Sequence, residues 1–226
     1  MTEVVRRPGQ NACIFGLRGS GKSTLSRQLM QSYPRVLIVD PHREHGNPDP
    51  RVHYTGAVEI GSLEQLVEYL GQTQGRWRIA YFNTALEQEF PRLCALAWEL
   101  GDCLFVVEEV DRFCGPGRIS PEFFDIVNYG RHAPGPPAPE RPVDYLTISR
   151  YPAAVHIAVR SQAYEIYCFT MNEPAHVEYI AEVAGKEFAG GLQTLPPHHY
   201  RFLDLYDRRV GWRDVELGVQ PRSLPS

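Results

Sequence analysis

The chain has 226 residues, of which 43% are hydrophobic and 22% charged, and a formal net charge of −4. These values are ordinary for one globular domain, and the negative balance excludes a generally basic surface for nucleic acid. No apolar run reaches the roughly 20 residues of a membrane-spanning helix, and residues 1–7 lack a signal-peptide core. The five cysteines include no C-x-x-C pair, so we expect reduced thiols, no zinc site and an intracellular protein without a transmembrane segment.

The first predicted strand, residues 11–15, leads into a glycine-rich loop and then into a predicted helix over 23–30. Residues 16–23 read GLRGSGKS and match the phosphate-loop (Walker A) pattern G-x-x-x-x-G-K-[ST] at every fixed position. Gly16 and Gly21 allow the turn and the close approach of backbone N–H groups to phosphate oxygens. The helix that follows directs its N-terminus at the anion. We therefore predict nucleotide binding by Gly16, Arg18, Gly19, Ser20, Gly21, Lys22, Ser23 and Thr24.

Lys22 is one of only two lysines, the other being Lys186, although the chain has 23 Lys and Arg residues. Arginine therefore supplies almost all of the positive charge, which indicates that position 22 needs a property arginine lacks. A compact ammonium fits between the β- and γ-phosphates inside a tight loop, whereas a planar guanidinium is too wide. The hydroxyl of Ser23 is then expected on Mg²⁺, and ATP with Mg²⁺ is the predicted cofactor.

Hydrophobic patterning predicts further strands and helices that alternate along the chain. The strands are expected over 35–40, 78–82, 103–107, 143–149 and 164–169. The helices are expected over 62–72, 90–100, 120–129, 152–163 and 173–184. A terminal hairpin is expected over 200–215, turning near Asp207-Arg208. This alternation predicts an α/β fold, a mainly parallel sheet flanked by helices on both faces with a C-terminal β-hairpin. We predict a single P-loop ATPase domain over 1–226, with a motor core over 10–205 and a tail over 206–226.

Two adjacent acids, Glu108 and Glu109, end the most hydrophobic strand, 103–107. Strand carboxyl ends line the ligand crevice of a parallel sheet, and neighbouring strand residues point in opposite directions. One acid can therefore orient the Mg²⁺ shell while the other activates a water. We assign Glu108 to the metal and Glu109 to the water. Asp111 is the reserve for either role, and Asp40 is a weaker one because it also suits a strand-ending Asp-Pro turn.

Several segments occur in a specific order after the phosphate loop. They are the run E-E-x-x-R-F at 108–113, then Gly130-Arg131-His132, residues 146–155 (LTISRYPAAV) and residues 160–163 (RSQA). Together they resemble the HerA–FtsK superfamily of DNA-pumping ATPases over about residues 10–205. The chain is most similar to the genome-packaging ATPases of tailless icosahedral viruses with an internal membrane. The resemblance implies a RecA/ASCE-like P-loop fold and a homo-oligomeric ring, expected to be a hexamer.

The resemblance also implies an arginine that reaches the γ-phosphate of a neighbouring subunit. Arg131 matches the family's Gly-Arg and is our first choice, with Arg150 and Arg160 as alternatives. Cationic charge at this position speeds phosphoryl transfer by roughly 10³ or more. The chain departs from the family in two places: the first acid is usually Asp and is Glu108 here, and the sensor Gln is Arg150 here. The predicted catalytic residues are Lys22, Glu109, Arg131 and Arg150.

Contacts with double-stranded DNA are expected from arginines in two loops. Arg112 and Arg118 follow the acidic pair in a turn-rich segment, and Arg141 lies near the end of the proline-rich stretch 132–142, whose loop is flanked by Arg131 and Arg141. Such arginines meet phosphates without reading sequence. The other expected partners are capsid-vertex or viral membrane proteins, in the host cytoplasm or at the packaging vertex of the virion. The pairs His42/His45 and His198/His199 lack a supporting ligand cluster, so we interpret them as structural or solvated.

The function that these features favour is ATP-driven translocation of double-stranded DNA, packaging a viral genome into a preformed capsid. One alternative is a small nucleotide or metabolite kinase, in which the loop serves phosphoryl transfer to a bound acceptor. The other is an ATPase that drives conjugation, secretion or virion assembly. A GTPase is disfavoured because the chain has no N-K-x-D motif, and an ABC ATPase because it has no L-S-G-G-Q.

Overall fold

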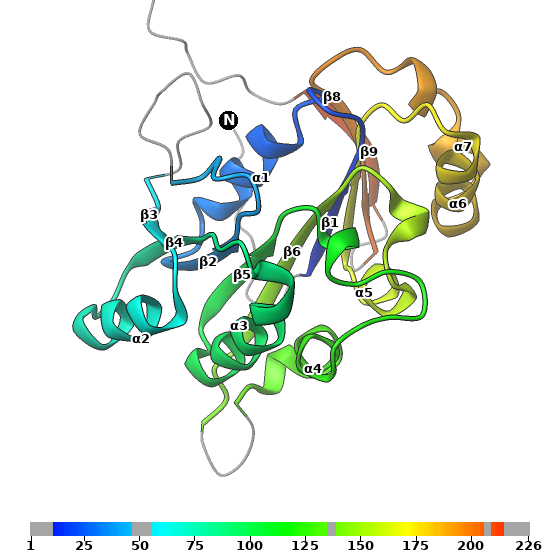
Figure 1. The fold of residues 1–226 in the computed structure, drawn as a ribbon. Coiled ribbons are helices and arrows are strands. Elements are labelled where there is room, and N and C mark those ends of the chain that lie inside the picture. The colour runs from blue at the N-terminus through cyan, green and yellow to red at the C-terminus, as the bar shows by residue number, and fades with distance from the viewer. Residues whose placement is uncertain (1–10, 47–55, 135–138, 206–208, 215–226) are drawn as a thin grey trace, which may run out of the picture.

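The computed structural model describes residues 11–46, 56–134, 139–205 and 209–214 (Figure 1). Within these residues one sheet of nine strands has the order β3-β4-β2-β5-β6-β1-β7-β8-β9. The strands from β3 to β7 along this order are mutually parallel, and β8 and β9 are antiparallel to their neighbours. In sheet order they are β3 (Val58–Ile60), β4 (Trp77–Tyr81), β2 (Arg35–Val39), β5 (Cys103–Val107), β6 (Val143–Ser149), β1 (Ala12–Phe15), β7 (Glu165–Cys168), β8 (His199–Asp204) and β9 (Arg209–Asp214).

Helices connect the parallel strands, as the predicted alternation requires. They are α1 (Lys22–Met30), α2 (Leu63–Gln72), α3 (Leu86–Leu100), α4 (Pro121–Tyr129), α5 (Ile157–Ser161), α6 (Pro174–Ala184) and α7 (Lys186–Ala189). Four short 3-10 turns accompany them: η1 (Val110–Arg112), η2 (Gly130–His132), η3 (Pro152–Ala154) and η4 (Leu192–Thr194). The predicted α/β class with a mainly parallel sheet is therefore confirmed.

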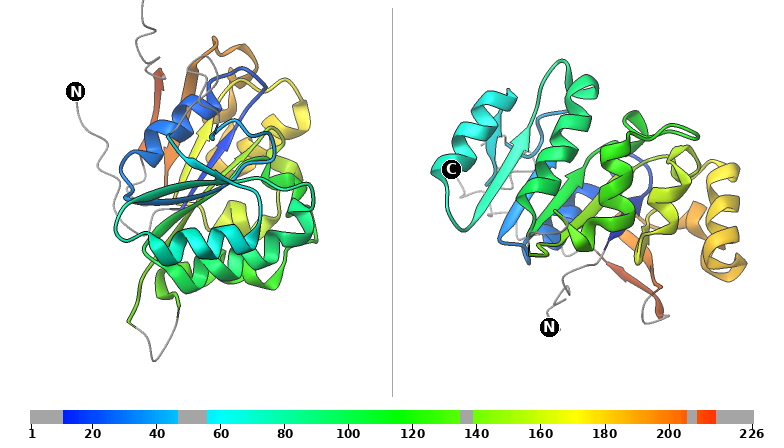
Figure 2. Two further views of the ribbon diagram at one scale, coloured as in Figure 1. Left: turned by 60° about the vertical axis from the view of Figure 1, so that its left-hand side comes forward. Right: turned by 90° about the horizontal axis from the view of Figure 1, so that it is seen from below.

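Each face of the sheet packs against its own helices. Side chains alternate along β1, so Ala12 and Ile14 join one core cluster with Leu25 and Leu29 of α1. Cys13 and Phe15 point the other way, into the larger core cluster that α2 to α6 cover. Figure 2 shows α1 on one side of the sheet and the helices from α2 to α5 on the other. Both faces are thus buried, which explains why the central strands are continuous apolar runs.

The topology brings four separate segments to one edge of the sheet. β2, β5, β6 and β1 are neighbours in this order and run parallel, so their carboxyl ends lie side by side. Asp40 follows β2, the acidic pair follows β5, Arg150 follows β6 and the phosphate loop follows β1. This edge is where ligands bind in open α/β sheets.

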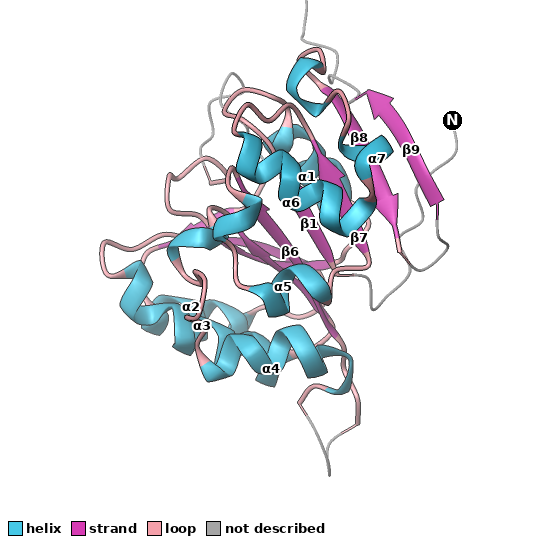
Figure 3. Ribbon diagram, turned by 90° about the vertical axis from the view of Figure 1, so that its right-hand side faces the viewer, coloured by secondary structure: helices cyan, strands magenta, loops and turns pink. Residues whose placement is uncertain are grey.

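The predicted C-terminal hairpin is confirmed. β8 pairs with β7, and β9 pairs with β8 as the last strand of the sheet (Figure 3). Because β8 is antiparallel to β7, its first residues lie at the same edge as the phosphate loop. The expected turn near Asp207-Arg208 lies outside the described residues.

The structure differs from the predicted elements chiefly in two helices and in one short strand. α3 begins at Leu86 rather than at residue 90, and Pro91 lies inside it. The helix predicted over 152–163 divides into η3 and α5, because Val155 is extended and the ring of His156 accepts a hydrogen bond from the backbone N–H of Ala158. The three-residue strand β3 was not predicted.

Candidate nucleotide-binding site

The phosphate loop has the backbone that its glycines predict. Gly16, Gly19 and Gly21 all have positive φ values, of 147°, 74° and 112°. At Gly16 a Cβ atom would lie 2.5 Å from the Cβ of Phe169 on the neighbouring segment. Glycine is therefore required there both by conformation and by space. Gly21 caps the N-terminus of α1 and so directs the first turn of that helix into the loop.

Lys22 lies within this loop and is largely buried. Its Nζ donates a hydrogen bond to the carbonyl of Leu17 at 2.7 Å, so the side chain folds across its own loop. Burial lowers the pKa of Lys22 to about 8, and the nearby carboxylate of Glu108 opposes this shift only in part. Burial therefore disfavours the ammonium here, and phosphate oxygens would supply the negative charge that stabilises it.

A cavity of about 710 Å³ opens over the loop at the carboxyl edge of the sheet. It contains residues from the phosphate loop, from the segment after β2, from the acidic pair and from the end of β6. Its lining comprises Arg18, Gly19, Gly21, Lys22, Ser23, Thr24, His42, Glu44, Glu108, Glu109, Ile148, Ser149, Arg150 and His198. The predicted nucleotide-binding residues Gly16 and Ser20 lie beneath this lining as buried parts of the loop. A volume of this size lies within the range of small-molecule and cofactor sites.

Glu108 is held on the inner side of the cavity. One carboxylate oxygen, Oε1, lies 2.9 Å from Nε2 of His45, whose side chain is completely buried. The hydrogen bond with Glu108 raises the pKa of His45 although burial, the largest single effect, acts in the opposite direction. Asp40 supports this arrangement from below, since its carboxylate accepts the backbone N–H groups of Glu44 and His45.

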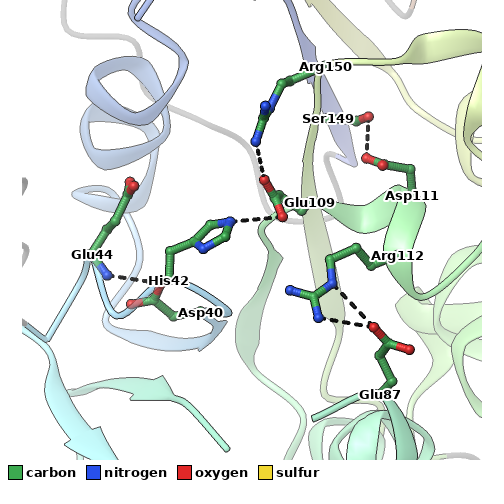
Figure 4. A network of polar contacts seen from close by, with 9 residues as sticks. All are labelled: Asp40, His42, Glu44, Glu87, Glu109, Asp111, Arg112, Ser149 and Arg150. Carbon is green, nitrogen blue, oxygen red and sulfur yellow. Dashed lines mark hydrogen bonds and ion pairs between the residues drawn. The ribbon is translucent and has the colours of Figure 1, made fainter. Parts of the chain in front are cut away.

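Glu109 lines the same cavity, is more exposed than Glu108 and has different partners. Its carboxylate accepts a hydrogen bond from Nη2 of Arg150 at 2.5 Å and contacts Nε2 of His42 at 2.9 Å (Figure 4). Burial raises the pKa of Glu109, but these two partners outweigh it, and the pKa lies below its ordinary value. The residue has a left-handed backbone, with φ of 49° and ψ of 50°. This uncommon conformation turns Glu109 away from the direction of Glu108.

The residues expected to hold Mg²⁺ suit that ion chemically. Ser23 supplies a hydroxyl and Glu108 a carboxylate on the same cavity. Mg²⁺ prefers such oxygen ligands and takes one or two of them from protein, completing its shell with waters and phosphates. Within the described ranges, no group of three or more His, Cys, Asp or Glu side chains could hold a metal ion without such additional ligands.

Asp111, the reserve acid, is engaged elsewhere. Its Oδ1 accepts a hydrogen bond from the hydroxyl of Ser149 at 2.5 Å, which links η1 to the end of β6. It lines a smaller hollow together with Glu109, Arg150 and Tyr151 rather than the main cavity. The structure therefore places Glu108 and Glu109, and not Asp111, over the phosphate loop.

The DNA-contact candidates lie in two different places. Arg112 and Arg118 are exposed beside the carboxyl edge, where Arg112 pairs with Glu87 at 3.0 Å (Figure 4). Arg118 donates to the carbonyl oxygen of Arg112 at 2.8 Å. Arg141 precedes β6 at the opposite edge and donates to the carbonyl of Glu99. DNA binding by these residues stays a prediction.

Arg131 is not part of the cavity of its own chain. It lies in η2, before β6 and so at the amino edge of the sheet, where it is exposed and its Nε donates to His132. Its role as a finger directed at a neighbouring subunit stays a prediction. Of the two alternatives, Arg150 lines the cavity, whereas Arg160 stacks over the ring of Tyr179 at 3.9 Å.

Three histidines at this edge were not assigned a site role from the sequence. His42 contacts Glu109, His45 contacts Glu108, and His198 lines the cavity while its backbone N–H donates to the carbonyl of Ser20. The signal for His42 and His45 was their position just after a buried strand. It could not be used because the sequence does not show that β2 pairs with β5.

Comparison with known proteins finds likeness in structure alone. No family model and no curated protein matches the chain. The genome packaging NTPase B204 from Sulfolobus turreted icosahedral virus 2, solved in complex with sulfate, has a TM-score of 0.72 and 16% identity over 94% of this chain and 99% of that one. Its complex with ATP-gammaS gives a TM-score of 0.71, with 16% identity over 94% and 100%.

A second similar structure is EssC (ATPases 2 and 3) from Geobacillus thermodenitrificans. It has a TM-score of 0.53 and 10% identity, covering 95% of this chain and 40% of that one. At these identities the likeness shows the fold, and the chain has the fold of the P-loop ATPases, as predicted.

The described part of the chain contains no helix long and apolar enough to cross a membrane.

Proposed function

We propose that this protein is an ATPase of the FtsK/HerA type that moves double-stranded DNA during the packaging of a viral genome. The observation that carries the proposal is the cavity in which Lys22, Glu109 and Arg150 meet over the phosphate loop. The shared fold of a genome packaging NTPase supports it, and B204 has been solved with AMP, AMPPCP and ATP-gammaS. ATP is accordingly the proposed nucleotide.

Within the cavity each residue has a distinct task. The N–H groups of the phosphate loop and Lys22 would hold the β- and γ-phosphates, and Arg150, which lines the same cavity, would act on the terminal one. Glu109 remains ionised because of its low pKa and orients the attacking water. Ser23 and Glu108 would hold Mg²⁺, which neutralises charge that develops on the phosphates. Because Glu109 lines the cavity and is placed to act on water, the site suits hydrolysis better than transfer of phosphate to a bound acceptor.

The larger assembly is part of the same proposal. We place the chain in a homo-oligomeric ring, expected to be a hexamer, with Arg131 supplied to the neighbouring subunit. Arg112 is the last residue of η1 and Arg118 follows in the next turn, and both are exposed, so movement of the acidic pair during hydrolysis would reach them directly. Arg141 is the third candidate for DNA phosphates. We also propose partners at a capsid vertex or viral membrane, and a site of action in the host cytoplasm or in the virion. The division of the chain into a motor core and a tail is likewise a proposal.

The test is the rate of ATP hydrolysis with and without double-stranded DNA of unrelated sequences. We expect stimulation that does not depend on sequence and that falls steeply as salt is raised. Lys22→Ala is the control and should show no hydrolysis under either condition. ATP hydrolysis without any response to DNA would favour an ATPase that acts on protein. Phosphorylation of an added nucleotide acceptor with no phosphate release would favour the kinase alternative.

A further inference from the structure

His45 occupies an unusual position for a histidine. Its side chain has no exposed surface, and its Nε2 lies 2.9 Å from Oε1 of Glu108, itself only 9% exposed. Histidine is rarely buried this completely, and a buried polar ring is costly unless it is hydrogen-bonded. The contact with Glu108 compensates for this cost.

The loop that carries His45 is itself fixed. Asp40 is 1% exposed, and its Oδ2 accepts the backbone N–H of His45 at 2.7 Å while its Oδ1 accepts that of Glu44 at 3.1 Å. Asp40 directly follows β2, the strand that pairs with β5. The carboxylate of Asp40, at the end of β2, therefore fixes the backbone of His45. This places the ring of His45 at the end of β5, beside Glu108.

The backbone of Glu108 is tied to the same strand. Its N–H donates to the carbonyl of Val39 at 3.2 Å, continuing the pairing of β2 with β5 by one residue. Glu108 is thus restrained at both ends, through its backbone by Val39 and through its carboxylate by His45. A free glutamate side chain has several rotamers, so these restraints reduce the conformational entropy that ion binding would otherwise have to overcome.

We infer that His45 is a positioning residue that holds the carboxylate of Glu108 in the orientation needed to bind Mg²⁺ with the nucleotide. This inference rests on the proposed function, in which Glu108 is the metal acid. The ring contacts Oε1 of the carboxylate, and Glu108 also lines the cavity, so its second oxygen is the one proposed to bind the ion. Carboxylates that bind metals are commonly oriented by such outer hydrogen bonds, and loss of one weakens metal affinity by about 10–100-fold.

The neighbouring acid provides an internal contrast. The partners of Glu109 are His42 and Arg150, whose side chains are 50% and 39% exposed. His42 and Arg150 can separate from Glu109 and be solvated by water. Separation of His45 from Glu108 would instead leave a buried polar ring without this partner. The fixed acid is therefore suited to hold an ion in one geometry, and the acid with exchangeable partners is suited to act on water.

The experiment measures nucleotide binding rather than turnover. Binding of a fluorescent ATP analogue is titrated with MgCl₂ and is also measured in EDTA, for the full chain and for three variants. His45→Leu keeps most of the volume but removes the donor, and His45→Gln keeps an N–H at a similar reach. His132→Leu is the matched control, because His132 also contacts a carboxylate, Glu140, at 2.7 Å but at the opposite edge of the sheet.

We expect His45→Leu to raise the Mg²⁺ concentration for half-maximal binding by about 10-fold or more, with the affinity in EDTA changed by less than about 2-fold. His45→Gln should recover most of the loss, and His132→Leu should show none. Should His45→Leu fail to fold by circular dichroism, His45→Asn replaces it, since its amide is too short to reach Glu108.

Two results would overturn the inference. A folded His45→Leu or His45→Asn variant with unchanged Mg²⁺ dependence would mean that His45 does not act on the ion. An equal loss of affinity with and without Mg²⁺ would mean that His45 supports the fold of the cavity alone. Failure of the unmodified chain to bind ATP at any Mg²⁺ concentration, as well as in EDTA, would instead remove the proposed function itself, so the two failures are distinguishable.

Discussion

The guanidinium of Arg150 and the carboxylate of Glu109 form a direct ion pair, with Nη2 of the former 2.5 Å from Oε1 of the latter. In the proposed mechanism each group acts elsewhere during hydrolysis: Arg150 at the terminal phosphate and Glu109 at the attacking water. On this proposal ATP would compete with Glu109 for Arg150. The pair is partly exposed, so its own contribution to stability is at most about 1 kcal/mol, which a triphosphate can readily exceed.

Replacing Arg150 by Gln should lower kcat by at least about 10-fold while leaving the dissociation constant of ATP within a few-fold of its original value. The cation lost is one that meets charge as it develops on the phosphate, whereas Lys22 and the loop still bind the ground state. Steady-state kinetics together with equilibrium binding separate these two quantities. Arg35→Gln is the matched control, because Arg35 lies at the start of β2, at the amino edge of the sheet, and donates to the carbonyl of Gly75. An unchanged kcat in Arg150→Gln would remove Arg150 from the catalytic residues.

The two adjacent acids should give opposite phenotypes on conversion to glutamine. Glu109→Gln should bind ATP with Mg²⁺ normally but hydrolyse it very slowly, because the amide cannot accept the proton of water. Glu108→Gln should need more Mg²⁺ for binding, since a neutral amide is a weaker ligand. Metal titrations of binding and single-turnover hydrolysis distinguish the variants. If the phenotypes are exchanged, Glu108 is the base and our assignment is reversed.

The phosphate loop was predictable from sequence because all of its function lies in one continuous segment. Gly16, Gly21 and Lys22 have roles that follow from backbone conformation and charge alone, and the structure places them accordingly. The acidic pair was predictable for a related reason, because it ends an apolar strand whose carboxyl end must lie at the ligand edge.

The remaining part of the site depends on strand order, which hydrophobic patterning does not give. β2 lies beside β5, and only this neighbour relation brings His45 to Glu108 and His42 to Glu109. The split of residues 152–163 into two short helices likewise depends on a local competitor, the ring of His156, that accepts a backbone hydrogen bond. The sequence therefore did not predict which strands are neighbours, nor that a histidine ring would accept a backbone hydrogen bond at the start of a helix.

Lys22 should make the stability of the protein depend on pH in a defined direction. Burial lowers its pKa to about 8 from 10.5, so between these values the unfolded chain binds more protons than the folded one. Stability then rises with pH over this window, and below pH 8 the folded state carries the full penalty. Lys22→Met should therefore be more stable than the unmodified protein at pH 7, by about 1–3 kcal/mol, and the difference should shrink toward pH 10.

Urea unfolding of both proteins without nucleotide, at pH 7, 8, 9 and 10, measures this difference, and other titrating groups cancel in the subtraction. Lys186→Met is the control, because Lys186 is the other lysine and is exposed on α7. A difference that stays constant across these pH values would show that desolvation of the Lys22 ammonium is not its cause.

Arg131 gives the sharpest test of the proposed ring, because the structure places it at the amino edge, far along the strands from its own phosphate loop. If it acts on a neighbouring subunit, Arg131→Ala should lower hydrolysis in the assembled ring with ATP affinity nearly intact. Arg76→Ala is the control for a general loss of charge, because Arg76 is exposed just before β4 at the same edge. Mixing Arg131→Ala with Lys22→Ala subunits should then restore part of the activity, because some interfaces pair an intact loop with an intact Arg131. Mixed rings verified by native mass spectrometry but lacking any recovery would exclude Arg131 as the finger and leave Arg150, which already lines the cavity, as the cation at the terminal phosphate.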